Sequence, residues 1–210
     1  MERLDGIENT ENTENAGLKE QVSSLEEKLL NTRLELEKNQ QYQNRDTFKI
    51  CGIKEPSLPP NVQEDTTETV TNFFAKAGVT LPKEELSMTH RLPSRETTRS
   101  KALLVKLRSR IVRNRLIRMK KDFRNNELLK GEYPDAFIVE HLTPLRAKVA
   151  YQLRNDETIE RVWTIDGRIK VIKKGAGTND KPITIDSLAQ LTKLGPNWTK
   201  EAIKKLVFEA

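Results

Sequence analysis

The hydrophobic positions change their spacing along the chain, and each change marks a different kind of element. Over residues 18–44 they recur at alternating steps of four and three, the spacing of a coiled coil. We expect this helix to associate with copies of itself through an apolar seam formed by Leu18, Val22, Leu25, Leu29 and Leu36. Leu30 and Leu34 fall outside the seam, which indicates either a wider apolar face joining more than two helices or an ordinary helix packed on its own domain.

Residues 1–17 come before the seam and contain no comparable pattern. Glu8–Asn15 form a polar triplet repeat, E-N-T-E-N-T-E-N, that has nothing to bury. A segment of this composition buries too little apolar surface to offset the conformational entropy that the chain loses when it becomes ordered. We therefore expect a disordered segment or a frayed helix start.

After residue 45 the spacing shortens to that of strands. Four apolar runs predict strands at 47–53, 86–92, 102–107 and 136–139, and two amphipathic segments predict helices at 63–78 and 108–124. The buried faces of the two helices are expected to consist of Val70, Phe73, Phe74 and Ala77, and of Val112, Leu116, Met119 and Phe123. The order β-α-β-β-α-β predicts a ferredoxin-like, RNA-recognition-like domain over residues 45–140.

A smaller α/β unit is expected over residues 141–194. Thr143 and Pro144 have the residue types of a helix N-cap and first helical position. Residues 162–171 read as a β-hairpin whose Asp166-Gly167 pair favours a type I′ turn. Residues 195–210 are expected to form a terminal helix or tail. The predicted fold class is α+β, with a coiled-coil helix at the N-terminus.

Charge is distributed unevenly between the two ends. The 210 residues carry a net charge of +6 and have a pI near 9.3, but residues 1–40 have a net charge of −5, so the other residues carry +11. This asymmetry indicates different roles for the two parts. The single cysteine, Cys51, rules out an intramolecular disulfide and a multi-cysteine zinc site. No apolar segment has the ~20 residues of a membrane span, and we expect an intracellular protein of the cytoplasm, the nucleus or both, without a membrane partner.

The helix at 108–124 concentrates the positive charge. Like charges spaced four apart on a helix repel each other, so a helix that keeps so many cations suggests a polyanionic partner, and phosphate backbones are the commonest one. The alternative is a solvated surface helix with a skewed composition. The candidate nucleic-acid-binding residues are Arg95, Arg99, Arg108, Arg110, Arg113, Arg115, Arg118, Lys120, Lys121, Arg124, Arg146, Arg168 and Lys170.

Aromatic residues and catalytic motifs narrow the function further. RNA-recognition domains stack bases on aromatic side chains of their first and third strands, whereas here the third strand has none and the first has only Phe48. Base stacking across the open sheet is therefore not expected, and Tyr151 and Trp163 are the exposed-aromatic candidates, with core packing favoured for Trp163. His90 and His141 belong to no catalytic motif and no phosphate-binding loop is present, so we expect no enzyme and no cofactor.

The order of these elements resembles the first-open-reading-frame protein of LINE-type retrotransposons. The insect version is the more similar, and its C-terminal region is shared with the baculovirus few-polyhedra (FP) protein. The resemblance covers roughly residues 18–190 and is carried by Arg45 with Phe48–Ile53, by His90–Leu92, by Ala102–Leu107, by Val139–Arg146 and by Val162–Val171. It implies an oligomeric nucleic-acid chaperone that binds RNA or single-stranded DNA and associates with itself as a dimer or trimer.

Two other functions are compatible with the sequence. One is an interaction protein whose coiled coil recruits a protein partner, as the resemblance to a viral structural protein allows. The other is a nuclease or transposase, for which the scattered acidic residues give no support. Salt-sensitive binding of nucleic acid distinguishes the chaperone from the recruiter, and divalent-dependent strand cleavage would distinguish the nuclease from both.

Overall fold

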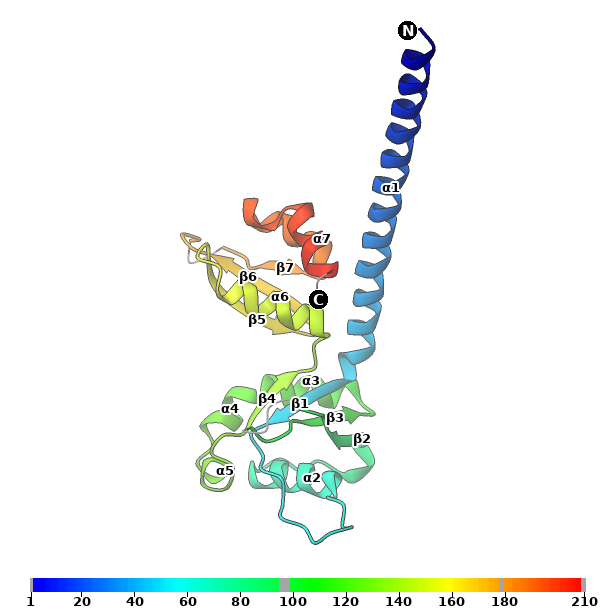
Figure 1. Cartoon of the computed structure of the whole chain (residues 1–210). Coiled ribbons are helices and arrows are strands. Elements are labelled where there is room, and N and C mark those ends of the chain that lie inside the picture. The colour runs from blue at the N-terminus through cyan, green and yellow to red at the C-terminus, as the bar shows by residue number, and fades with distance from the viewer. Residues whose placement is uncertain (1, 95–98, 178–179, 209–210) are drawn as a thin grey trace. The chain divides into compact units, whose positions relative to one another are not determined.

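A computed structural model of the chain describes residues 2–94, 99–177 and 180–208, with side chains from residue 15 onward. The fold belongs to the α+β class, as the sequence predicts, and contains one four-stranded and one three-stranded sheet among the described residues (Figure 1). The chain divides into two compact units. One is Gln40–Thr184, and the other combines Met1–Asn39 with Ile185–Ala210.

The N-terminal helix is longer than the sequence indicated. Helix α1 spans Glu2–Gln43 and therefore includes the polar triplet repeat. Of the two expectations for residues 1–17, a helix start agrees with this helix and a disordered segment does not. Extending an existing helix fixes one residue for each hydrogen bond gained, and the leucine-rich segment that follows the repeat provides the helix to extend.

The first sheet contains all four of the strands expected in this part of the chain. They run in the order β2-β3-β1-β4, and β1 lies antiparallel to both β3 and β4, while β2 lies antiparallel to β3. Their bounds are β1 Thr47–Cys51, β2 Leu86–Arg91, β3 Leu103–Leu107 and β4 Phe137–Glu140. The 3₁₀ helices η1, Asn44–Asp46, and η2, Lys83–Glu85, come directly before β1 and β2.

Four helices connect these strands and cover one face of the sheet. Helix α2, Thr66–Lys76, follows β1 and is N-capped by Asp65. The segment after β3 was expected to be a single helix but is divided at Met119 into α3, Arg110–Arg118, and α4, Lys120–Asn125. A further helix, α5, Glu127–Glu132, leads to β4.

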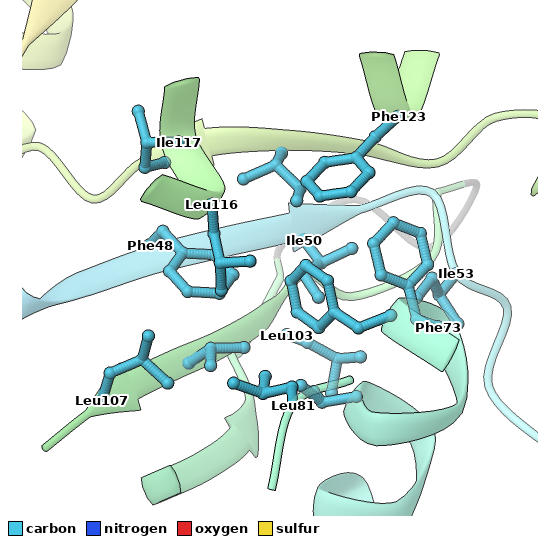
Figure 2. Close-up of a cluster of buried hydrophobic side chains, with 14 of the residues drawn as sticks. Phe48, Ile50, Ile53, Phe73, Leu81, Leu103, Leu107, Leu116, Ile117 and Phe123 are labelled. Atoms are coloured by element: carbon cyan, nitrogen blue, oxygen red, sulfur yellow. The ribbon is translucent and has the colours of Figure 1, made fainter. Parts of the chain in front are cut away.

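The core lies between this face of the sheet and the helices (Figure 2). Its centre is aromatic, with edge-to-face contacts joining Phe74 to Phe48, Phe73 and Phe123 at ring-centroid distances of 6.0, 5.3 and 5.6 Å. Such pairs add about 0.5–1.5 kcal/mol each beyond the burial of their surface. Both predicted helix faces are confirmed, with Val112, Met119 and Ala77 partly buried at the edge of the core.

The smaller α/β part of the same unit follows β4. Helix α6, Pro144–Arg154, begins as predicted, because the Thr143 side chain accepts a hydrogen bond from the Arg146 amide. Strands β5, Ile159–Ile165, β6, Arg168–Lys173, and β7, Ile183–Ile185, form a sheet in that order. Asp166 and Gly167 have φ values of 54° and 74°, which confirms the type I′ turn.

In the other unit, the C-terminal segment contacts α1. It consists of the 3₁₀ helices η3, Leu188–Leu194, and η4, Pro196–Trp198, followed by α7, Lys200–Phe208. Lys204 forms an ion pair with Glu26, and the Arg33 guanidinium lies 4.6 Å from the centre of the Phe208 ring. The α1 residues in these two contacts are charged, and Leu29 lines a pocket with Glu201 and Phe208 of α7.

Candidate nucleic-acid interface

Helix α3 is amphipathic, and its inner face determines which cations point outward. Ser109 caps the helix by accepting a hydrogen bond from the Val112 amide at 3.3 Å. Leu116 and Ile117 pack into the core, and Phe123 continues the buried face in α4. The remaining faces of both helices are exposed to solvent.

Seven cationic side chains lie on the outer faces of α3 and α4 or, for Arg108, just before α3. They are Arg108, Arg110, Arg115, Arg118, Lys120, Lys121 and Arg124, and we call this set the cationic face. Within the described residues, none of the seven side chains forms an ion pair or a hydrogen bond. Asp122 is the one acidic residue in the two helices. The cationic face thus presents uncompensated charge, which is the arrangement that phosphate backbones bind.

Arg113 does not belong to this surface, although the sequence analysis placed it there. Its side chain is buried, with the whole residue 1% exposed. The guanidinium donates to Glu140 at 2.9 Å and to Asp166 at 3.3 Å. It lies on the inner side of α3 because it is three residues before Leu116 and four before Ile117. We call the buried pair of Arg113 and Glu140 the buried ion cluster; Asp166 contacts it from an exposed position on the hairpin turn.

Arg146 is a second correction to the predicted site. It is buried and donates to the carbonyl oxygen of Gly167 at 2.6 Å. Glu140 accepts a bond from the Gly167 amide at 3.4 Å, so the hairpin turn is bound by residues of both the first sheet and α6. Gly167 also has to be a glycine, because a Cβ there would come within 2.7 Å of the Gln41 side chain. Arg113 and Arg146 therefore position the hairpin and are not available to a ligand.

The other predicted cations lie at several different places. Arg95 falls outside the described residues, and Arg99 is exposed in the connection between β2 and β3. Arg168 is exposed on β6, whereas Lys170 is half-buried and donates to the Thr184 hydroxyl at 3.0 Å. Of the residues predicted to bind, only those of the cationic face form a continuous run on adjoining helices.

Three side chains on the far face of the first sheet, opposite α2–α5, were not predicted as functional. Lys49 on β1 and Phe137 on β4 line a cavity there together with Lys54, from the loop that follows β1. Phe137 alternates along β4 with the buried Ile138, and this alternation was the available signal that it points away from the core.

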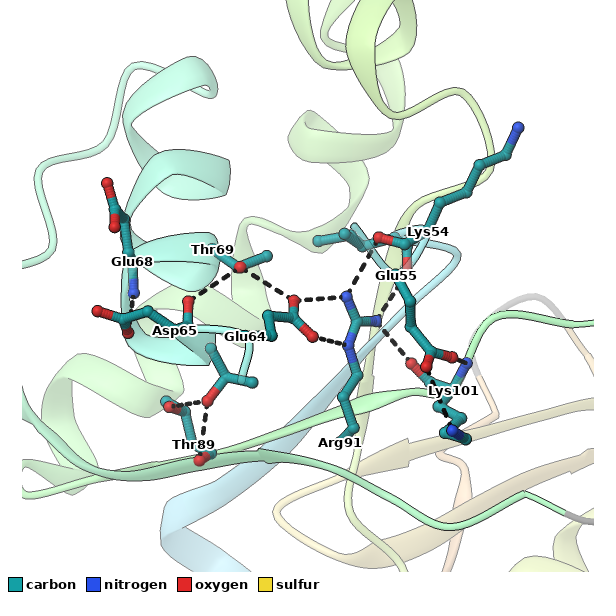
Figure 3. Close-up of polar contacts among 11 residues, drawn as sticks. Lys54, Glu55, Glu64, Asp65, Glu68, Thr69, Thr89, Arg91 and Lys101 are labelled. Carbon is teal, nitrogen blue, oxygen red and sulfur yellow. Dashed lines mark hydrogen bonds and ion pairs between the residues drawn. The ribbon is translucent and has the colours of Figure 1, made fainter. Parts of the chain in front are cut away.

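Arg91 connects the last residue of β2 to the loop after β1 (Figure 3). Its guanidinium binds both carboxylate oxygens of Glu64, with donor–acceptor distances of 2.8 and 2.9 Å. It also donates to the carbonyl oxygens of Ile53, Lys54 and Lys101. The hydrogen bond from Arg91 lowers the pKa of the Glu64 carboxyl. This clamp fixes the loop that carries Lys54.

Of the two histidines, His141 is half-buried, and its Nδ1 atom has no hydrogen-bond partner among the described residues. Burial, together with the charges of Lys49 and His90, lowers the pKa of His141. Within the described residues, no group of three or more His, Cys, Asp and Glu side chains is arranged to hold a metal ion. The same residues include no helix with the length and apolar character needed to cross a bilayer.

The predicted seam of α1 is exposed. Leu18, Val22, Leu25, Leu29 and Leu36 are all between 47% and 62% exposed. Leu34, by contrast, is buried, as are Glu37 and Gln41 further along the same side of the helix. Helix α1 thus has one side that is buried within the chain and another, apolar side that is exposed.

Comparison with known proteins gives no match to a protein-family model and none to a curated protein.

Proposed function

We propose that this protein is an oligomeric, weakly sequence-specific, single-stranded nucleic-acid-binding protein that acts as a chaperone without catalysing a reaction. The observation that carries the proposal is the cationic face, with six exposed cations and the half-buried Lys120, none of which forms an ion pair among the described residues. Mutual repulsion of those charges costs stability unless a ligand relieves it. The phosphodiester backbone of a nucleic-acid strand supplies the negative charge that would relieve this repulsion.

The first sheet supports the same proposal. Its connectivity, β1-α2-β2-β3-α3-α4-α5-β4, and its strand order, β2-β3-β1-β4, are compatible with a split βαβ arrangement in which three short helices take the place of the second. On this basis we propose an RNA-recognition-like domain, followed by an FP-like unit, in a protein of retrotransposon origin located in the cytoplasm or nucleus. Because phosphate contacts position a protein without reading bases, little sequence preference is expected.

The exposed seam of α1 supports self-association. Five leucine and valine side chains exposed along one side of a helix form an apolar stripe of the kind that coiled-coil partners bury. We propose a dimer or trimer joined through this seam. Several copies would bring several cationic faces to one strand, which raises the overall affinity without any new contact.

A salt titration of binding to a single strand and to a duplex of the same length tests the proposal. With ~5 phosphates contacted, the logarithm of the association constant is expected to fall by about 3.5 per decade of salt for the single strand and about 4.5 for the duplex. An affinity that does not change between low and moderate salt would contradict the proposal. Divalent-dependent cleavage of either probe would instead identify a nuclease.

A second candidate function is favoured by the seam itself. An exposed apolar stripe is equally suited to a helix from another protein. In that case the protein would be a recruiter, and its seam would bind a partner while the cationic face remained solvated. A monodisperse monomer by light scattering, combined with no salt-dependent binding of nucleic acid, would favour this function.

A further inference from the structure

The far face of the first sheet carries side chains that take no part in the core. Phe48 and Ile50 on β1 point into the core, so Lys49 and Cys51 point to the opposite face. Cys51 is paired in register with Phe137 on β4, and side chains that face each other across an antiparallel pair project from the same face. Phe137 and Cys51 are therefore neighbours on the far face.

A cavity of about 710 Å³ opens at this place. This volume is within the usual range for small-molecule sites, about 300–1,000 Å³. Three cations contribute to its lining, namely Lys49, Lys54 and Arg99, against one acid, Asp135. Among the described residues, the side chains of Lys49 and Lys54 have no ion-pair partner. Phe137, which is 42% exposed, supplies an aromatic ring at the wall.

We propose that this cavity binds one unstacked nucleotide of a single strand, with the base on Phe137 and the phosphate beside Lys49 and Lys54. The inference rests on the proposed function and adds to it a subsite that prefers single strands. A base can lie on an aromatic ring only when its own face is free, which a duplex does not allow. The stacking residue is on the fourth strand, because the third strand has no aromatic residue and Phe48 on the first points into the core.

The surrounding contacts hold the cavity in shape before a ligand arrives. Arg91 donates to the carbonyl oxygen of Lys54 at 3.2 Å and to that of Lys101 at 2.8 Å. Both segments lead into the wall of the cavity, since Lys54 and Ala102 line it. Gly52 lets β1 approach β4 closely, because a Cβ there would lie 1.9 Å from the Asp135 carbonyl oxygen. A preorganised site loses less entropy on binding.

The first test compares Phe137→Ala with Phe137→Trp in the full chain, using a 12-nucleotide oligouridine and a 12-base-pair duplex as probes. Losing one base–aromatic contact is expected to weaken single-strand binding by about 5- to 160-fold. Duplex binding should be unchanged, and Phe137→Trp should restore single-strand binding. Leu128→Ala is the matched control, since it removes an apolar side chain that is 71% exposed on α5 and lies outside the cavity. It should alter neither affinity.

The second test uses Cys51, the only cysteine of the chain, as an internal reporter. It lines the cavity, so a bound nucleotide should slow its alkylation by iodoacetamide. Burial raises the pKa of the Cys51 thiol, and all samples are therefore compared at one alkaline pH. Saturating oligouridine is expected to slow alkylation at least fivefold, whereas saturating duplex should leave the rate unchanged.

The outcomes separate this inference from the proposed function. If both probes bind with the expected salt dependence but Phe137→Ala binds oligouridine as wild type does, the subsite is refuted and the cationic face stands. Equal losses for single strand and duplex, or an unprotected Cys51 at saturation, also refute the subsite. If neither probe binds, the proposed function fails and the subsite fails with it.

Discussion

The buried ion cluster and the cationic face use the same kind of residue on the same helix for opposite purposes. Arg113 and Arg115 are two residues apart on α3, yet Arg113 is buried against Glu140, whereas Arg115 is exposed and has no partner among the described residues. For Arg113, desolvation has been compensated within the fold. For Arg115 the charge remains in water, available to a ligand. The contrast shows that a run of cations on a helix contains two populations, and only burial tells them apart.

Removing Arg113 should produce the largest effect on stability. The Glu140 side chain is 1% exposed, so Arg113→Ala leaves a buried carboxylate without its cation and is expected to destabilise the fold by about 3–5 kcal/mol. Chemical denaturation measures this loss. Any Arg113→Ala protein that is still folded should keep the wild-type salt slope, because Arg113 contacts no phosphate.

A double substitution makes this prediction specific to the ion pair. Arg113→Met combined with Glu140→Leu removes both charges and keeps apolar volume, so it should recover most of the lost stability. If the single and double variants are equally unstable, the loss reflects packing and the electrostatic explanation is wrong.

Removing three exposed arginines of α3 tests whether the cationic face binds nucleic acid. Arg110, Arg115 and Arg118 are exposed, so changing all three to Ala should shift stability by no more than about 0.5 kcal/mol per site. Their loss should reduce the single-strand salt slope by about 2, at roughly 0.7 per contact. Arg113 is left unchanged in this variant because its loss is expected to destabilise the fold and would confuse the comparison. Binding as tight as that of wild type would show that the cationic face is merely solvated.

Helix α1 also carries buried and exposed residues of one type, in this case leucines. The exposed leucines provide a test of self-association. Leu34 is buried while Leu18 and Leu25 are exposed. If the proposed oligomer forms, Leu18→Lys combined with Leu25→Lys should give a monomer by light scattering, with the free energy of unfolding changed by less than about 0.5 kcal/mol per site. Deleting residues 1–44 is a poorer test, because Gln41 bonds to the Thr143 amide and the His141 carbonyl oxygen. An unchanged mass would show that the seam is not the assembly surface.

The sequence predicted what depends on local spacing. The four strands of the first sheet, the core faces of α2 and α3, the cap at Thr143 and the Asp166-Gly167 turn all follow from side-chain period or turn chemistry, and the structure has each of them. The break at Met119 was not predicted, because the apolar spacing continues through it.

The candidate site was predictable only in part, since burial of a charge depends on distant partners. Arg113 pairs with Glu140, 27 positions along the chain, and with Asp166, 53 positions away. No local pattern brings those residues together. The spacing of Arg113 from Leu116 and Ile117 nevertheless indicated that it shares their buried face of the helix. Leu34 gave a similar indication, because it does not fit the heptad seam and is buried in the structure.

The smallest expected effect concerns Arg91, another inward arginine, through the pH dependence of stability. Its hydrogen bonds lower the pKa of Glu64 from the usual value of 4.5. A carboxyl whose pKa is lower in the folded state stabilises the fold above its unfolded pKa, and this contribution is lost as the pH falls through the folded value. Wild-type stability should therefore decline below about pH 4.5 more steeply than that of Glu64→Gln. Glu127→Gln is the control, because Glu127 pairs with Lys130 at an exposed position and surface pairs contribute little. Parallel acid profiles for wild type and Glu64→Gln would show that the Arg91 clamp positions the loop without an electrostatic contribution to stability.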